Sequence, residues 1–171
     1  MSRLEGMVVL CNTFLFADLC DYTEHSFRYG DEFAAELAVG FHSIVRELAS
    51  SESCEVVKAI GDAVMVRAVD VQDAVRLAHR IHASTGPLGY PPVRIGIDTG
   101  PAVPREGDWY GTTVNQAARV AEAASPGEML LTDRARAALG TCGGETRIVE
   151  RGVRALKGLP ESVVHAAYAG Q

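Results

Sequence analysis

Two aspartates occupy positions from which a carboxylate would project at the edge of a β-sheet. Asp18 follows the apolar run TFLFA and opens the polar segment DLCDYT, and Asp62 follows Gly61 in VVKAIGDAVMV. A Gly-Asp pair between two valine-rich runs is typical of a tight hairpin, because both residues tolerate the positive φ of such a turn. If the two strands are neighbours, both carboxylates offer the hard oxygen ligands that Mg²⁺ or Mn²⁺ prefers. The alternative is that Asp18 starts a turn and Asp62 is a solvated hairpin residue.

A lysine lies in the same predicted hairpin. Lys58 is within the first strand and not at the tip, where a charge would be solvated. A core strand gains nothing from a charge, because burying an unpaired ammonium group is among the costliest changes that a fold can make. Lys58 therefore requires an explanation beyond packing.

An asparagine and an arginine share one face of a predicted helix. Asn115 and Arg119 are i and i+4 in the segment TTVNQAARVAEA, and the apolar residues around them predict a partly buried face. A guanidinium held on a packed helix beside an amide is well placed to bind phosphate and sugar oxygens. The alternative is that Arg119 pairs with the neighbouring Glu122.

Hydrophobic periodicity indicates the elements that hold these side chains. The expected strands are residues 13–17, the two arms of the hairpin within 56–66, 93–98, 128–132, 145–150 and 162–168, and the expected helices are 33–48, 74–81, 112–124 and a short one near 133–139. Asp31 is the expected cap of the first helix. The segment DLCDYT reads as a polar turn, and a loop is expected around Pro101 and Pro104.

The order of these elements predicts the fold class. Strand, helix, strand, strand, helix and strand follow one another, with extra elements at the C-terminal end. This order is typical of an α+β fold with a ferredoxin-like βαββαβ core and a C-terminal extension, and we expect helices on one face of the sheet. With no internal repeat or linker, residues 1–171 are expected to form a single domain.

Composition excludes several classes of partner. The formal net charge is −6, and the basic residues form no run suited to DNA or to an anionic membrane. No apolar stretch approaches the length of a membrane span or resembles a signal peptide. Cytoplasmic localisation is therefore expected, with neither nucleic acid nor membrane as a partner. The cysteines show no metal-binding spacing and are expected to be reduced thiols, at Cys11, Cys20, Cys54 and Cys142.

Three segments together resemble a known family. TFLFADLCDYT, VVKAIGDAVMV and GDWYGTTVNQAARV occur in this order, and they resemble the signature segments of the class III nucleotidyl cyclases. LKGLPESV resembles the C-terminal LKG stretch of the same family, so the resemblance covers residues 12–168. It implies a cyclase homology domain that forms a head-to-tail homodimer, with two active sites shared between the protomers.

The resemblance also implies roles for the first segment and the hairpin. Asp18 and Asp62 match the family's metal aspartates, and the carbonyl of Leu19 matches a further ligand, for two Mg²⁺ or Mn²⁺ ions per active site. Tyr22 and Thr23 fall in the loop that surrounds the triphosphate with backbone N–H groups.

Five further residues match positions that bind the nucleotide. Lys58 and Asp108 match the pair that contacts the purine. Asn115 matches the residue that orients the ribose, and Arg119 matches the residue that stabilises charge on the α-phosphate in the transition state. Lys157, in the LKG stretch, matches a lysine on the terminal phosphates.

One position departs from the family pattern. Asp21 stands where the family often has glycine. Aspartate tolerates the left-handed conformation better than most residues do, so the loop is expected to form.

The purine-contacting pair predicts the substrate. Adenine presents a donor at N6 and an acceptor at N1, which complement Asp108 and Lys58, whereas guanine presents the reverse pattern. Unmatched buried polar groups cost about 1–3 kcal/mol each. The sequence therefore predicts an adenylate cyclase that converts ATP to 3′,5′-cyclic AMP and pyrophosphate. The alternatives are a guanylate cyclase and an inactive nucleotide-binding regulator of the same fold.

Overall fold

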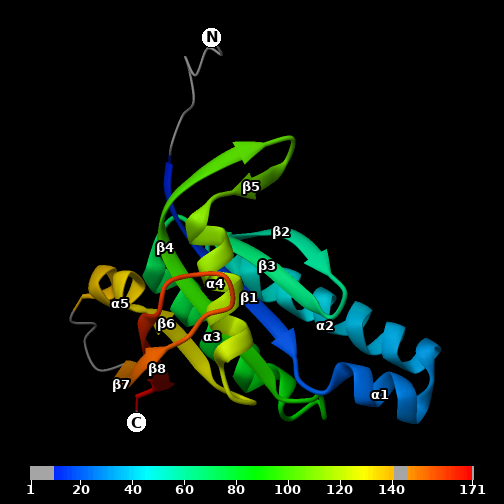
Figure 1. Ribbon diagram of the computed structural model, residues 1–171. Coiled ribbons are helices and arrows are strands. Elements are labelled where there is room, and N and C mark those ends of the chain that lie inside the picture. The colour runs from blue at the N-terminus through cyan, green and yellow to red at the C-terminus, as the bar shows by residue number, and fades with distance from the viewer. Residues whose placement is uncertain (1–9, 141–145, 171) are drawn as a thin grey trace.

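The computed structural model describes residues 10–140 and 146–170, which form one sheet and the helices packed on it (Figure 1). The strands are β1 (Leu10–Leu19), β2 (Cys54–Ile60), β3 (Ala63–Ala68), β4 (Val93–Arg105), β5 (Asp108–Tyr110), β6 (Met129–Thr132), β7 (Thr146–Arg154) and β8 (Ser162–Ala169). The helices are α1 (Tyr22–Tyr29), α2 (Asp31–Ser51), α3 (Val71–Thr85), α4 (Thr112–Ala123) and α5 (Asp133–Leu139). None of the helices in these ranges has the length and apolar character needed to cross a membrane.

The sheet confirms the predicted α+β fold class. Its strand order is β2-β3-β1-β4-β6-β8-β7, with β5 paired to β4 outside this path. The pairs β2–β3, β3–β1 and β1–β4 are all antiparallel, which is the arrangement of a ferredoxin-like βαββαβ core. A parallel pair between β4 and β6 then joins the C-terminal extension to this core.

Helices cover both faces of the sheet. Alternate residues of β1 divide between two apolar clusters: Leu15 belongs to the cluster that contains residues of α2 and α3, whereas Phe14 and Phe16 belong to the one that contains residues of α4. Because successive side chains of a strand point to opposite faces, α4 lies on the face opposite α2 and α3, as Figure 1 also shows. The expectation of helices on one face is correct for the core helices and wrong for α4.

The segment after β1 is a helix where the sequence predicted only a turn. Asp21 adopts the left-handed conformation with φ 57°, as expected for the position where the family often has glycine, and α1 begins at the next residue. α1 then ends at Gly30, with φ 92°, and this residue caps α2 in place of the predicted Asp31. Asp31 instead accepts a hydrogen bond of 2.8 Å from the hydroxyl of Ser26.

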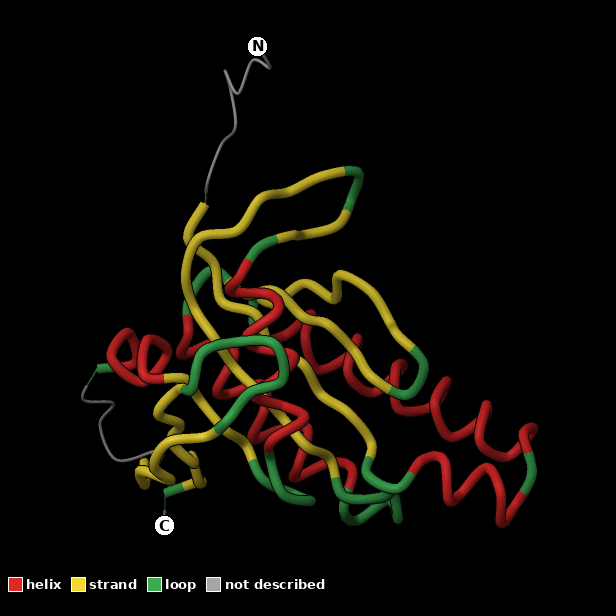
Figure 2. Tube along the Cα trace, viewed as in Figure 1, coloured by secondary structure: helices red, strands yellow, loops and turns green. Residues whose placement is uncertain are grey.

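The predicted loop around Pro101 and Pro104 is instead the second half of β4. This half runs to Arg105 and pairs with β5, forming the arm that projects beyond the main sheet in Figure 2. A proline disrupts a central strand because it lacks an N–H group, but it is tolerated where a strand has an open edge. Pro101 still pairs with Cys11 of β1, but β6 pairs only with residues 95–97, so the other edge of β4 is open there. Pro104 lies in the part of β4 that has left the main sheet and pairs with β5.

Of the four cysteines, Cys11, Cys20 and Cys54 are free thiols, as expected. Cys142 lies outside the described residues. Burial raises the pKa of the Cys54 thiol to about 12.

The approach of α4 to β4 generates a prediction about Gly96. A Cβ at this position would lie 2.1 Å from the backbone nitrogen of Ala121 and 2.5 Å from the carbonyl oxygen of Ala117. Gly96→Ala must therefore displace the helix, and we expect a loss of about 1–3 kcal/mol in the free energy of unfolding, measured by urea denaturation.

Gly86→Ala is the matched control for this substitution. Gly86 has φ −57°, and its added Cβ would meet only the His82 carbonyl oxygen at 3.6 Å. We expect a change within about 0.5 kcal/mol. Equal losses in the two variants would contradict the close packing of α4.

Candidate active site

The two predicted metal-binding aspartates lie beside each other. Asp18 pairs in register with Ala63, the residue that follows Asp62 at the tip of the β2–β3 hairpin. Burial, and after it the charge of the neighbouring Asp18, raise the pKa of Asp62 to about 6. The register of β1 and β3 therefore brings together two carboxylates that are 44 positions apart in the sequence.

Arg94 is a member of this cluster that sequence reasoning missed. It lies on β4 opposite Asp18, and its guanidinium donates a hydrogen bond to the Asp18 carboxylate. Its Nε is buried and makes no hydrogen bond. A signal was present in the sequence, because Arg94 is the lone basic residue in the largely apolar strand VRIGID, just as Lys58 is the lone basic residue in its own strand.

The donor set at this strand end fits a hard divalent cation. Among the described residues, no group of three or more His, Cys, Asp or Glu side chains could hold a metal ion by itself. Mg²⁺ is commonly bound by one or two carboxylates, with substrate phosphates and water completing the shell. Asp18 and Asp62 are the two carboxylates that would fill this role, and the backbone carbonyl of Leu19, the last residue of β1, is next to Asp18 in the chain.

Lys58 and Asp108 form an ion pair of 2.5 Å between β2 and β5. The hydrogen bond from Lys58 lowers the pKa of the Asp108 carboxyl below its usual range. Asp108 also accepts a hydrogen bond of 2.8 Å from the backbone N–H of Trp109. The structure therefore brings together the two residues that the resemblance assigns to the purine.

A β-bulge explains why a lysine is tolerated in β2. The pairing with β3 shifts between Val56 and Lys58, so Val57 is an extra residue in the strand. Val56 packs in the cluster under α2 and α3, and strict alternation would point Lys58 to that same buried face. The bulge instead sets Lys58 opposite Met65, whose side chain lies on the α4 face, where Asp108 is within reach.

Asn115, Arg119 and Lys157 line one surface pocket of about 340 Å³. The first two lie on α4, and Lys157 comes from the segment between β7 and β8. Arg119 pairs with Glu122 at 2.6 Å, which is the alternative partner weighed from the sequence. This pair is exposed, and exposed pairs hold their side chains only weakly, so the guanidinium remains available to the pocket.

Tyr22 and Thr23 are the first two residues of α1. The N–H groups of a first helical turn have no partner within the helix and are available to an anion. Only three residues separate this helix end from Asp18 near the end of β1, namely Leu19, Cys20 and Asp21.

These features together define the class of protein. A sheet of this order, with a carboxylate pair at one strand end and an amide-bearing and basic pocket beside α4, is that of a class III nucleotidyl cyclase domain. The chain belongs to the family of adenylate and guanylate cyclase catalytic domains, whose family model matches residues 9–167.

Relatives in this family include bacterial adenylate cyclases. A pH-sensitive adenylate cyclase of Mycobacterium tuberculosis is 34% identical over 132 residues, which are 75% of this chain and 32% of that protein. An adenylate cyclase of Streptomyces griseus is 36% identical over 121 residues, or 70% of this chain and 30% of that protein. The chain thus spans about a third of the length of these curated relatives.

Solved structures with the same fold act on either purine nucleotide. The adenylyl cyclase CyaB from P. aeruginosa has a TM-score of 0.85 at 20% identity and covers 97% of both chains. The guanylate cyclase domain of RhGC from Catenaria anguillulae, solved with GTP, has a TM-score of 0.82 at 20% identity and covers 95% of this chain and 98% of that chain. At these identities the likeness shows the fold alone.

The ion pair between Arg94 and Asp18 can be tested by a double-mutant cycle. Because both side chains are largely buried, we expect Arg94→Gln and Asp18→Asn each to cost about 1–2 kcal/mol of unfolding free energy. The double variant should cost clearly less than the sum, since neither group is then left alone. Urea denaturation without added metal measures all three.

The exposed Arg105 at the end of β4 provides the control. Arg105→Gln should change stability by less than about 0.5 kcal/mol. Additive losses in the double variant would show that Arg94 and Asp18 do not stabilise each other.

Proposed function

We propose that this chain is the catalytic domain of an adenylate cyclase, which converts ATP to 3′,5′-cyclic AMP and pyrophosphate. The observation that carries the proposal is the Lys58–Asp108 pair, which sets one donor and one acceptor side by side on the α4 face. The named adenylate cyclases among the relatives support the same activity.

The choice of ATP follows from the chemistry of this pair. Asp108 accepts a hydrogen bond from the adenine N6 amine, and Lys58 donates one to N1. Guanine would set its O6 acceptor against a carboxylate and its N1–H donor against an ammonium group. Each mismatch leaves a polar group unpaired at a cost of about 1–3 kcal/mol, so ATP is favoured over GTP.

Asp18 and Asp62, with the carbonyl of Leu19, would hold two Mg²⁺ or Mn²⁺ ions. When bound, these ions neutralise phosphate charge and lower the pKa of the ribose 3′-hydroxyl. Asn115 orients the ribose so that the 3′-oxygen faces the α-phosphorus in line with the leaving pyrophosphate. Arg119 leaves its ion pair with Glu122 and stabilises the negative charge that develops on the α-phosphoryl oxygens. Such a contribution is typically worth about 10²–10³ in rate.

The remaining phosphates require their own contacts. Lys157 lines the same pocket as Arg119 and is proposed to bind the terminal phosphates. Tyr22 and Thr23 offer the free N–H groups of the first turn of α1 to the same anion. Asp21 adopts the left-handed conformation that the loop needs, which supports this placement.

The active site is proposed to be shared across a head-to-tail homodimer. Among the described residues, those that line the pocket of Asn115 and Arg119 do not include Asp18 or Asp62. One two-fold related copy could supply the missing half, and a two-fold axis would generate two equal sites. A guanylyl cyclase domain from Blastocladiella emersonii, described as a non-canonical dimer, shares this fold with a TM-score of 0.81 at 17% identity. It supports dimerisation of the fold and not the head-to-tail arrangement, which rests on the resemblance and on the divided site.

Incubation with either nucleotide tests the proposal. Purified protein with Mn²⁺ should form cyclic AMP from ATP and far less cyclic GMP from GTP, with products identified by chromatography. Asp62→Ala should abolish turnover while leaving a folded protein, because Asp62 lies at a hairpin tip. Comparable use of GTP would indicate a guanylate cyclase, and nucleotide binding without product would indicate an inactive regulator.

Mixing two inactive variants tests the shared site. Asp18→Ala and Arg119→Ala should each be inactive, but their heterodimer would carry both lesions in one site and leave the other intact. Random exchange makes about half of the dimers mixed, so roughly a quarter of wild-type activity should return. Cyclic AMP formation before and after mixing measures this recovery.

A tagged pull-down confirms that subunits exchange. Exchange without any return of activity would refute the cross-dimer site, because a site built within one protomer cannot be repaired by its partner.

A further inference from the structure

The segment that carries Lys157 is attached to α4 by apolar packing, at Leu156 and Leu159, and by a hydrogen bond at Ser162. Leu156 is 5% exposed and packs in the apolar cluster that contains Val120. At the other end, Ser162 begins β8 and accepts a hydrogen bond of 3.0 Å from the side chain of Gln116. Lys157 lies between Leu156 and Ser162, in a turn closed by a 3.0 Å hydrogen bond from the N–H of Leu159 to the carbonyl of Leu156.

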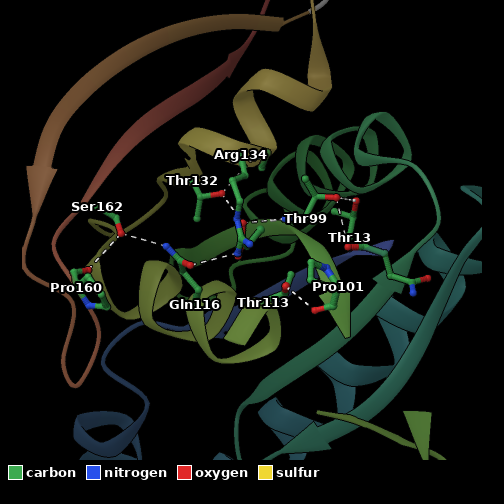
Figure 3. Close-up of polar contacts among 12 residues, drawn as sticks. Thr13, Thr99, Pro101, Thr113, Gln116, Thr132, Arg134, Pro160 and Ser162 are labelled. Atoms are coloured by element: carbon green, nitrogen blue, oxygen red, sulfur yellow. Dashed lines mark hydrogen bonds and ion pairs between the residues drawn. The ribbon is translucent and has the colours of Figure 1, made fainter. Parts of the chain in front are cut away.

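The Gln116 side chain is fixed at both of its polar atoms (Figure 3). Its Oε1 accepts a hydrogen bond of 3.2 Å from Arg134, and its Nε2 donates to Ser162. The Ser162 hydroxyl in turn donates to the carbonyl of Pro160 at 3.2 Å. Each hydrogen bond in this chain of contacts has a defined donor and acceptor. Together these bonds set the distance between α4 and the segment.

A buried carboxylate anchors the far end of this chain of contacts. Asp98 on β4 is fully buried and accepts hydrogen bonds from Arg134, from the Thr132 hydroxyl at 2.5 Å and from the N–H of Thr99 at 2.9 Å. Asp98 therefore fixes the Arg134 guanidinium on the sheet, and the same guanidinium contacts Gln116. The contacts Asp98–Arg134–Gln116–Ser162, here called the polar relay, join β4, α5, α4 and β8.

The polar relay and the candidate active site lie on neighbouring faces of α4. Asn115 faces the pocket that contains Lys157, whereas Gln116 lines a second pocket of about 410 Å³ together with Arg134 and Ser162. Leu159 lines both pockets. The Lys157 segment therefore lies across α4 between the two pockets.

We propose that Gln116 is a positioning residue that holds Lys157 over the phosphate-binding half of the site. This inference rests on the proposed function, in which Lys157 binds the terminal phosphates. Without the Gln116–Ser162 contact, the segment keeps the apolar packing of Leu156 and Leu159 and the β7–β8 pairing at its ends, but it loses its side-chain hydrogen bond to α4. The Lys157 ammonium then samples a wider volume. Phosphate affinity then falls because binding must first order the segment, while Asn115 and Arg119 stay in place on α4.

Hydrogen exchange tests the structural half of this proposal without reference to activity. In Gln116→Ala and Ser162→Ala, the amides of residues 155–159 and 161 should exchange faster than in the wild-type protein, while those of the β1–β4 core should not. Ser162→Thr keeps the hydroxyl and should restore slow exchange. Glu161→Gln, an exposed neighbour in the same segment, serves as the control. Unchanged exchange in both alanine variants would overturn the anchoring role.

Kinetics and binding test the functional half. Gln116→Ala removes the hydrogen bond to Ser162 that holds the segment, and we therefore expect it to raise the KM for ATP about three- to tenfold, with kcat changed by less than about twofold. Affinity for inorganic pyrophosphate, measured by calorimetry, should fall by a similar factor. Ser162→Ala should behave alike, and Ser162→Thr should recover most of the loss.

A double variant separates this inference from the proposed function. If Gln116 acts through Lys157, Gln116→Ala should have no further effect on pyrophosphate affinity in a Lys157→Ala background. Independent losses would refute the positioning role and leave the proposed function standing. No loss in Lys157→Ala alone would instead show that Lys157 does not bind phosphate, and both the assigned role and the inference would fail.

Discussion

The close packing of α4 on the sheet is the constraint on which the candidate site depends. At Gly96 a Cβ would lie 2.1 Å from the nitrogen of Ala121, so the helix rests directly on the strand backbone. This contact buries one face of α4 and fixes its rotation, since Ala117 also lies against the strand. The outward faces are then set: one presents Asn115 and Arg119, and the next presents Gln116. A single missing side chain on β4 thus determines where several polar side chains point.

A second constraint acts on the opposite side of the site, where the sheet must hold charged side chains without a large desolvation penalty. Asp62 meets it by lying at a hairpin tip, and Asp18 by lying near the end of its strand beside Arg94. Lys58 cannot use either solution, because it lies within β2. The bulge at Val57 turns it to the α4 face, where it meets Asp108. The irregularity in the strand is therefore what makes the Lys58–Asp108 pair possible.

The sequence predicted the helices, the strands and the groups of candidate site residues better than the contacts that join these groups to one another. Period-two and helical patterns gave most of the strands and helices, because burial on one face leaves a strong signal. The bulge at Val57 left no such signal, since one extra residue in a valine-rich strand looks like regular alternation. The segment DLCDYT was predicted as a turn, and α1 was missed, because the start of that helix depends on Asp21 adopting a left-handed conformation. The polar relay was beyond reach for another reason: Asp98 and Arg134 meet only after β4 and α5 pack together.

Two cations of the candidate site, Lys58 and Arg119, are already paired within the chain, and this pairing bears on selectivity. Lys58 is paired with Asp108, and Arg119 is paired with Glu122, so both cations have a partner in the free protein. Under the proposed function, binding is an exchange of one partner for another, and its free energy is a difference between two satisfied states. A nucleotide that replaces every broken contact is accepted at little cost, whereas one that leaves an ammonium or a carboxylate facing a like group loses the whole value of the pair. The specificity of such a site therefore comes from the contacts that the free protein already makes, because those contacts define what the substrate has to replace.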